Sequence, residues 1–191
     1  MISVEEARER ILANFQRLPV ERKPLLAALG QVLAADVVSP YDLPPLANTG
    51  MDGYALRAAD TAGASEAAPV RLRVITNLAA GYVSDVPIGP GEAARIMTGA
   101  PIPPGADAVV PFEETDEVLR GPNEQPRPGG EVAVFKAAKH GAHVRERGGD
   151  VRSGNRVIEA GRVLRASEIG VLSSLGLTEV AVFRRPVVAI L

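Results

Sequence analysis

Glycine and proline divide this chain into short segments. The 191 residues include 19 glycines and 16 prolines, which interrupt the hydrophobic runs along the sequence. Beyond Met51 these runs are brief, rich in β-branched residues and separated by Gly, Pro and Asp, which is typical of short strands joined by turns. The sequence therefore predicts a small, barrel-like β domain with strands at 70–75, 93–97, 106–111 and 131–135.

Helical signals precede this β-rich region. Ser3-Val4-Glu5-Glu6 has the form of a capping box, and apolar residues recur at helical spacing as far as Pro19. These features predict a helix over 3–17, whose apolar stripe is interpreted either as core or as a dimer seam. A short helix over 24–29 is expected to follow.

Mixed signals follow the β-rich region. Residues 156–164 are expected to form a hairpin, and 179–183 a strand. A helix is predicted over 166–175, closed by Gly176, with Leu177 placed for the hydrophobic contact of a Schellman motif.

The order of these segments predicts the domain organisation. We expect an α+β fold, in which residues 1–48 plus 140–185 form a discontinuous α/β first domain and 49–139 form the inserted β-rich domain. Residues 186–191 are a continuous apolar run typical of a buried parallel strand. We interpret this run as the first strand of a third domain that the sequence does not include.

Composition excludes several classes of function. The chain has no cysteine, so it has no disulfide, no thiolate chemistry and no Cys-ligated metal. Its net charge is −2 and it has no Lys/Arg cluster, which argues against a nucleic-acid partner. No apolar run is long enough to span a membrane. The acidic N-terminus is unlike a signal peptide, and we expect a cytoplasmic protein.

Two loops carry the strongest candidates for function. Residues 49–55 and 95–110 each place a small oxygen-bearing side chain, Asp52 or Thr98, where glycines break an apolar run. Glycines allow tight turns and close ligand approach. Asp52 suits a hard cation such as Mg²⁺, or caps its own turn. Thr98 and Gly99 offer a hydroxyl and backbone N–H groups to a phosphate or oxyanion, or simply end a strand.

Other polar residues give weaker signals. Arg145, Arg147 and Asp150 lie in a charged turn that suits anion binding or a solvated ion pair. His140 and His143 have no third ligand in their neighbourhood of the sequence, so surface histidines are the better interpretation. Asp107 is interpreted as a turn cap.

The motifs together resemble the N-terminal part of the molybdopterin molybdenumtransferase family, which includes MoeA and the gephyrin E domain. Five segments carry the resemblance in order over nearly the whole chain: 33–40, Met51-Asp52-Gly53-Tyr54-Ala55, Arg95-Ile96-Met97-Thr98-Gly99-Ala100-Pro101 with 105–110, Arg147-Gly148-Gly149-Asp150, and 166–180.

The resemblance implies an activity. Members of the family are homodimers of four-domain subunits that insert molybdate into adenylylated molybdopterin and release AMP in a Mg²⁺-dependent step. It implies that this chain corresponds to the first two domains and the opening strand of the third, and that the chain alone is inactive. The alternative is a non-catalytic dimerisation or ligand-binding module of the same family.

The resemblance also implies roles for single residues. Asp52, Thr98 and Asp150 match catalytic positions, with Asp52 also the metal ligand. Arg145, Gly53 and Gly99 match positions that bind the pterin-linked substrate. The charged turn departs from the family pattern at Glu146 and Gly149, and Thr49-Gly50 replaces the usual Ser-Ala before the first loop.

Overall fold

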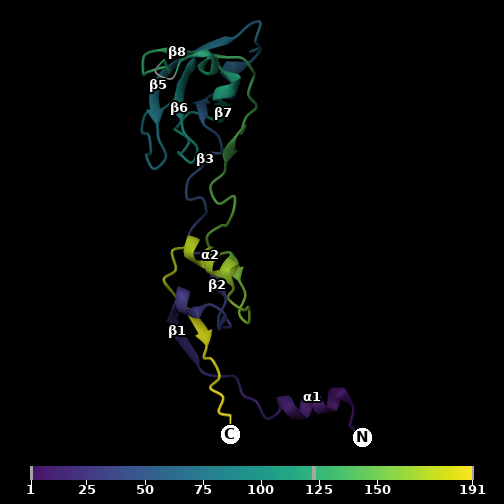
Figure 1. The fold of residues 1–191 in the computed structure, drawn as a ribbon. Coiled ribbons are helices and arrows are strands. Elements are labelled where there is room, and N and C mark those ends of the chain that lie inside the picture. The colour runs from purple at the N-terminus through teal and green to yellow at the C-terminus, as the bar shows by residue number, and fades with distance from the viewer. Residues whose placement is uncertain (1, 122–123, 191) are drawn as a thin grey trace. The chain divides into compact units, whose positions relative to one another are not determined.

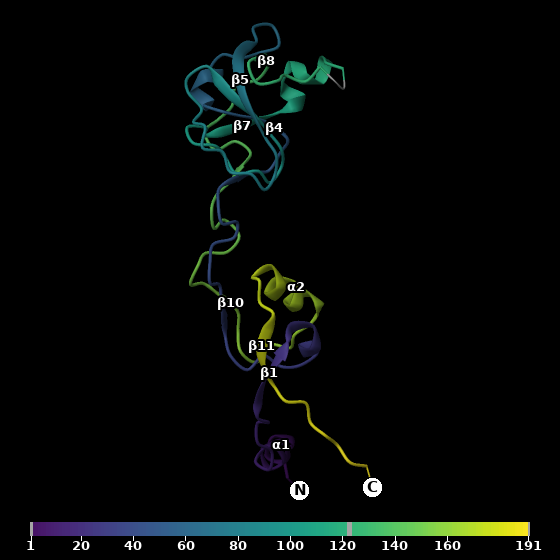
Figure 2. The ribbon, with the colours of Figure 1, turned by 90° about the vertical axis from the view of Figure 1, so that its left-hand side faces the viewer.

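The chain forms two compact units (Figures 1 and 2). The computed structural model describes residues 2–121 and 124–190. Unit 1 comprises Met1–Tyr41 and Ser153–Leu191, and unit 2 comprises Asp42–Arg152. Unit 2 is therefore inserted into the sequence of unit 1, and the mixed α+β class is as predicted.

The unit boundaries differ from the predicted boundaries after residues 48 and 139. Segments 42–48 and 140–152 belong to unit 2 because they pair with each other. Leu43 forms an isolated bridge with Val151. Strand β3 (Asn48–Thr49) pairs antiparallel with β9 (Val144–Arg145).

Unit 1 is built around one antiparallel strand pair. Strand β1 (Val20–Pro24) pairs with β11 (Glu179–Phe183). The 3₁₀ helix η1 (Leu25–Ala28) lies close to this pair and to helix α2 (Ala166–Ser174). These elements and their connections enclose one apolar core, which consists of Leu25, Ala28, Leu33, Ile158, Leu164, Ile169, Leu172, Val180 and Val182.

The predicted hairpin over 156–164 is wrong. Strand β10 (Arg156–Ile158) pairs with β2 (Val37–Val38), and Val163 bridges to Val32. Both halves of the expected hairpin therefore pair with a segment more than 100 residues earlier in the sequence. Non-local pairing of this kind leaves no turn signal for sequence analysis to detect.

Helix α2 ends as predicted. Gly176 has a φ of +68°, the left-handed conformation that a helix C-terminus favours. The N–H of Gly176 donates to Ser173 O at 2.9 Å, and the N–H of Leu177 donates to Leu172 O at 3.1 Å. These two bonds form the Schellman motif.

Helix α1 (Val4–Leu12) is shorter than the predicted helix over 3–17. Its N-cap is Ser3, whose hydroxyl accepts the N–H of Glu6 at 3.1 Å. No residue of α1 is buried. The apolar stripe read from the sequence is thus exposed in this chain and forms no part of the core.

Unit 2 is built on a five-stranded sheet with the order β7-β4-β6-β5-β8. Its strands are β4 (Gly53–Leu56), β5 (Val70–Leu78), β6 (Glu92–Ile96), β7 (Ala108–Pro111) and β8 (Glu131–Val134). Strands β5 and β6 are parallel and the other neighbours are antiparallel. An isolated bridge from Thr115 to Val134 joins the segment after β7 to β8, and a closed barrel is not confirmed.

Apolar residues fill both faces of this sheet. One core contains Tyr54, Leu56, Leu72, Val74, Ala93, Ala108, Val110, Val132 and Val134. The other contains Ala55, Leu78, Ile88, Ala94, Ile96, Ala100 and Val109. Successive residues alternate between the two cores, as strand geometry requires. The 3₁₀ helices η2 (Ala58–Thr61), η3 (Phe112–Glu114) and η4 (Asp116–Leu119) connect strands of this unit.

Residues 186–190 form no strand among the described residues. Val187, Val188 and Ile190 are exposed. The predicted opening strand of a third domain is therefore not formed in this chain, and Leu191 lies outside the described residues. No helix in the described ranges has the length and apolar character needed to cross a membrane.

Candidate functional site

Antiparallel pairing of β4 with β6 brings the two candidate loops together. Gly53, the first residue of β4, lies opposite Ile96, the last residue of β6. Asp52 comes directly before β4, and Thr98 follows β6 by two residues. The loops therefore meet at one end of the sheet, although they are 46 residues apart in the sequence.

Asp52 and Thr98 form a doubly hydrogen-bonded pair. The Oδ1 atom of Asp52 accepts the backbone N–H of Thr98 at 2.6 Å and its hydroxyl at 2.7 Å. No described residue hydrogen-bonds to Oδ2, and both residues are solvent-exposed. One carboxylate oxygen is thus fixed within the protein, and the other remains available to a ligand.

These bonds hold Asp52 in its ionised form. The Thr98 backbone N–H, and then the Thr98 hydroxyl, lower the pKa of Asp52 below its ordinary value. Partial burial opposes this change, and the positive charge of Arg95 adds to it. The pair therefore presents a negative charge at neutral pH.

Thr49 fixes the backbone of both loops. Its N–H donates to Ala100 O at 3.1 Å, and its carbonyl accepts the N–H of Gly99 at 2.9 Å. Its buried hydroxyl donates to Met51 O at 2.6 Å. Gly99 has a φ of +84°, which favours glycine at this position.

This network corrects one part of the sequence interpretation. The backbone N–H groups of Thr98 and Gly99 already donate within the protein, so neither is free for a phosphate. The Thr98 hydroxyl also uses its proton, on Asp52. Towards a ligand the pair therefore offers oxygen lone pairs, which suit a hard cation better than an anion.

Gly53 is required by strand packing. A Cβ atom at Gly53 would lie 2.1 Å from Val110 O, because β4 and β7 approach closely there. Gly53 is buried, and the close approach to β7 explains the glycine without any ligand.

Arg145 lies beside the Asp52 loop. On β9 it is paired with Asn48, and its Nε atom would be 3.5 Å from a Cβ atom at Gly50. The N–H of Gly50 donates to His143 O at 2.9 Å, which ties β9 to the start of the loop. The exposed guanidinium of Arg145 thus lies beside Gly50, which precedes Asp52 by two residues in the sequence.

Asp150 is placed elsewhere in unit 2. Its N–H donates to Leu43 O at 2.9 Å, and its side chain is exposed. In the same turn, Arg147 Nε contacts Asp42 Oδ2 at 2.6 Å. No described contact joins Asp150 to the Asp52–Thr98 pair, so the structure brings together only two of the three predicted catalytic residues.

The other candidates do not assemble a metal site. No group of three or more His, Asp or Glu side chains in the described part of the chain is arranged to hold a metal ion. His140 and His143 therefore stay unassigned. Asp107 Oδ1 accepts the N–H of Ala58 at 2.7 Å, at the start of η2, so its carboxylate bonds a segment 49 residues earlier in the sequence and not its own turn, which the sequence predicted it to cap.

Sequence analysis missed a polar cluster beside the loops. Arg95 on β6 lies opposite Tyr54 on β4. The Arg95 guanidinium binds Glu117 of η4 through two nitrogens, with Nη2–Oε1 at 2.6 Å, and Tyr54 OH donates to the same carboxylate. The guanidinium carbon lies 4.4 Å from the centre of the Phe112 ring. The sequence signal for this cluster was Arg95 itself, a charged residue inside the otherwise apolar strand segment 93–96.

This cluster shifts the pKa values of its members. Glu117 raises the pKa of Arg95. Burial, and then the hydrogen bond to Glu117, raises the pKa of Tyr54. The phenol is therefore neutral and the guanidinium charged over the whole physiological range.

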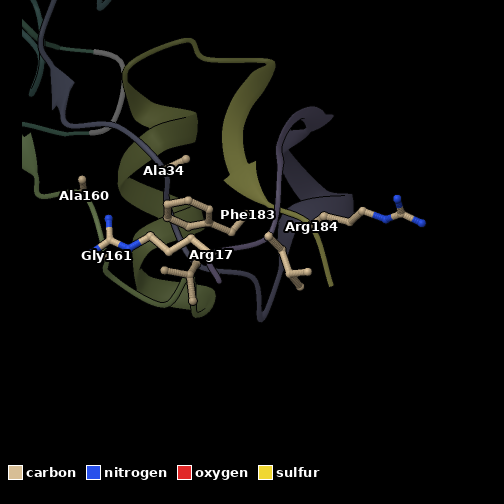
Figure 3. Close-up of a pocket in the computed structure, with 8 residues that line it drawn as sticks. Arg17, Ala34, Ala160, Gly161, Phe183 and Arg184 are labelled. Atoms are coloured by element: carbon tan, nitrogen blue, oxygen red, sulfur yellow. The ribbon is translucent and has the colours of Figure 1, made fainter. Parts of the chain in front are cut away.

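Unit 1 contains a separate cavity of about 410 Å³ (Figure 3). Arg17 lies beside it, with its guanidinium carbon 5.9 Å from the centre of the Phe183 ring. Val32, Ala34 and Gly161 are among its other lining residues. None of the predicted site residues lines this cavity.

A family model covers most of the chain. The family model described as the MoeA N-terminal region (domain I and II) matches residues 2–176. The chain belongs to this family.

Relatives and solved structures agree with this assignment. The chain is 40% identical over 187 residues to molybdopterin molybdenumtransferase 2 of Mycobacterium tuberculosis, covering 97% of this chain and 43% of the relative. It is 36% identical over 190 residues to the Staphylococcus aureus molybdopterin molybdenumtransferase, again covering 43% of that protein.

Two crystal structures of a molybdopterin biosynthesis MoeA protein from Pyrococcus horikoshii have similar folds. Their TM-scores are 0.79 and 0.86, at 38% and 33% identity, and the match covers 45% and 47% of those chains. The chain thus spans less than half the length of the relatives it matches.

Proposed function

We propose that this chain is the N-terminal part of a molybdopterin molybdenumtransferase, which inserts molybdate into adenylylated molybdopterin with release of AMP. The names of the relatives support the reaction, and the Asp52–Thr98 pair supports a place for this chain in it. The parent enzyme would act on a small pterin substrate in the cytoplasm.

The observation that carries the proposal is the geometry at Asp52. One oxygen is fixed by Thr98, and the other faces solvent without a partner among the described residues. Mg²⁺ binds one or two carboxylates together with substrate phosphates, so a lone carboxylate suffices. The oxygen donors of Asp52 and Thr98 fit this ion, which would neutralise charge on a phosphoanhydride.

The predicted site residues would act by their positions and charges. Asp52 and Thr98 hold a fixed pair of oxygen ligands, which reduces the reorganisation needed during the reaction. Arg145, beside Gly50, supplies a guanidinium suited to a phosphate or molybdate oxygen. Gly99 allows the tight turn that carries Thr98. Asp150 would join this group only through a part of the site that this chain does not form by itself.

The test is AMP release by a transferase that contains this chain. The corresponding N-terminal segment of the M. tuberculosis relative is replaced by this chain, and adenylylated molybdopterin, molybdate and Mg²⁺ are supplied. Asp52→Asn is expected to reduce release at least 100-fold while retaining the fold. Glu66→Gln, at an exposed acid of the same unit, is the matched control. Unchanged release in Asp52→Asn would remove Asp52 from the mechanism.

A second candidate function rests on helix α1. Its exposed apolar side chains, together with Phe15 beyond it, are not buried by any described part of the chain. They favour a homodimerisation module, either as part of the enzyme or in a non-catalytic member of the family. Sedimentation of the chain with and without α1 tests this candidate. A chain that is monomeric in both forms contradicts a dimerisation module.

A further inference from the structure

A third loop reaches the same end of the sheet as Asp52 and Thr98. Strands β5 and β6 are parallel, and Leu78 at the end of β5 lies beside Ile96 at the end of β6. The segment 79–87, which follows β5, therefore leaves the sheet where Thr98 does.

The start of this segment lies beside the Thr98 loop. The N–H of Met97 donates to Leu78 O at 3.0 Å. A Cβ atom at Gly99 would lie 4.0 Å from the Cβ of Ala80. Gly81, at the turn of the segment, has a φ of +88°. The segment 79–87 is thus a neighbour of the Asp52–Thr98 pair within unit 2.

The segment carries exposed apolar side chains, together with one exposed acid, Asp85, and one buried hydroxyl, Ser84. Tyr82, Val83 and Val86 are 71%, 65% and 47% exposed, and Met51 of the Asp52 loop is 38% exposed. The loop that neighbours the Thr98 loop therefore carries exposed apolar and aromatic side chains. Together with the Asp52–Thr98 pair, this loop matches a ligand with one anionic, cation-binding end and one flat heteroaromatic end.

We propose that segment 79–87 is the subsite for the heteroaromatic ring of the nucleotide-linked substrate, with Tyr82 as the stacking residue. The proposal rests on the proposed function and adds the place of the ring. A purine or pterin ring stacks on a tyrosine, and Met51 supplies an adaptable, polarisable contact. Asp52 and Thr98 then face the phosphate end of the same ligand.

The test is an NMR titration of the 191-residue chain with AMP and Mg²⁺, and separately with neopterin. We expect shifts in amides of 79–87 with either ring, and shifts at Thr98 and Gly99 with AMP and Mg²⁺. Tyr82→Ala is expected to weaken AMP binding about tenfold, and Tyr82→Phe to retain it, because stacking needs the ring but not the hydroxyl. Tyr41→Ala, in unit 1, is the matched control.

Each other outcome overturns the proposal. Equal affinity of Tyr82→Ala and the unsubstituted chain excludes stacking, and ribose 5-phosphate binding as tightly as AMP excludes a ring subsite. A change of sedimentation in Tyr82→Ala assigns the segment to a protein interface instead. Absence of any shift with both rings also rejects the subsite. AMP release tests the proposed function separately, because Asp52→Asn can abolish turnover whether or not Tyr82 stacks.

Discussion

The carboxylate of Asp52 has two oxygens with different surroundings. Oδ1 accepts two hydrogen bonds from Thr98, and Oδ2 has no partner among the described residues. This asymmetry lets one side chain both order its loop and present a charge. An aspartate is needed at position 52 for both roles, because an asparagine there would keep the size of the side chain but lose its charge.

The hydroxyl of Thr98 should control the ionisation of Asp52. Thr98→Val keeps the backbone bond and removes the side-chain bond, so the pKa of Asp52 should rise towards its ordinary value of about 4. A lowered pKa contributes stability above the ordinary value, and this contribution is lost as the pH falls through the folded value. Thr98→Val should therefore lose less stability on acidification. Carbon-13 NMR of the Asp52 carboxyl measures the change; Thr98→Ser, which restores the hydroxyl, should reverse it.

Two glycines should respond oppositely to alanine. Gly53→Ala places Cβ 2.1 Å from Val110 O and should destabilise unit 2 by about 3 kcal/mol or more. Gly170, in helix α2, has no atom within 4 Å of the added Cβ, and Gly170→Ala should stabilise unit 1 by about 0.5–1 kcal/mol. Residue-resolved hydrogen exchange measures both. A mild effect of Gly53→Ala would mean that β4 and β7 can separate.

At the scale of elements, Arg95 and Glu117 connect β6 to η4. Their side chains are 18% and 9% exposed, so the pair is largely removed from solvent. Removing one partner of such a pair leaves a charge without its counterion, which costs more than replacing both partners with apolar groups.

Substitutions in this pair should therefore be strongly non-additive. Glu117→Ala should destabilise unit 2 by about 3 kcal/mol, because Arg95 loses its partner. The double variant Arg95→Met with Glu117→Leu should recover most of this loss. Urea unfolding of the single and double variants gives the coupling free energy between the two side chains. Additive effects would show that the two side chains act independently.

Helix α1 should contribute little to the stability of unit 1. It has nine residues, none buried, and short helices are marginal in water without packing. Deletion of residues 1–15 should change the unfolding free energy of unit 1 by less than about 0.5 kcal/mol, as for other changes away from buried contacts. Denaturant unfolding at low protein concentration measures it. A larger loss at that concentration would show that α1 packs on its own chain.

Local signals predicted some elements well and others not at all. Helix α2 and its Schellman end were readable because capping and apolar spacing lie within the helix itself. Strand β4 was missed because all four of its residues are buried, which removes the alternation of a half-buried strand. Strand β1 was missed because its sequence, Val-Glu-Arg-Lys-Pro, is mostly charged.

At the scale of the whole molecule, the α+β class and the insertion of one unit into the other were predictable from the order of signals. The site was predictable only in part. Asp52 and Thr98 were singled out by the glycines that break two apolar runs, and a resemblance gave them roles, but their contact depends on the pairing of β4 with β6, which no local pattern encodes. Asp150 shared the same resemblance, yet its turn pairs with Leu43 and lies apart from the pair.

The family assignment and the length of the chain together define its place in the proposed enzyme. The match to the MoeA N-terminal region covers residues 2–176, and the relatives extend to more than twice this length. The chain supplies a prearranged carboxylate–hydroxyl pair. The rest of the transferase would supply the groups that complete the reaction.

Binding of Mn²⁺ in place of Mg²⁺ tests the central claim most directly, because both ions prefer oxygen ligands and Mn²⁺ broadens NMR signals near it. In the 191-residue chain with AMP present, the account predicts broadening at the amides of Met51, Thr98 and Gly99, and its loss in Asp52→Asn. Broadening centred on Asp150 and Asp42, or unchanged broadening in Asp52→Asn, would contradict it.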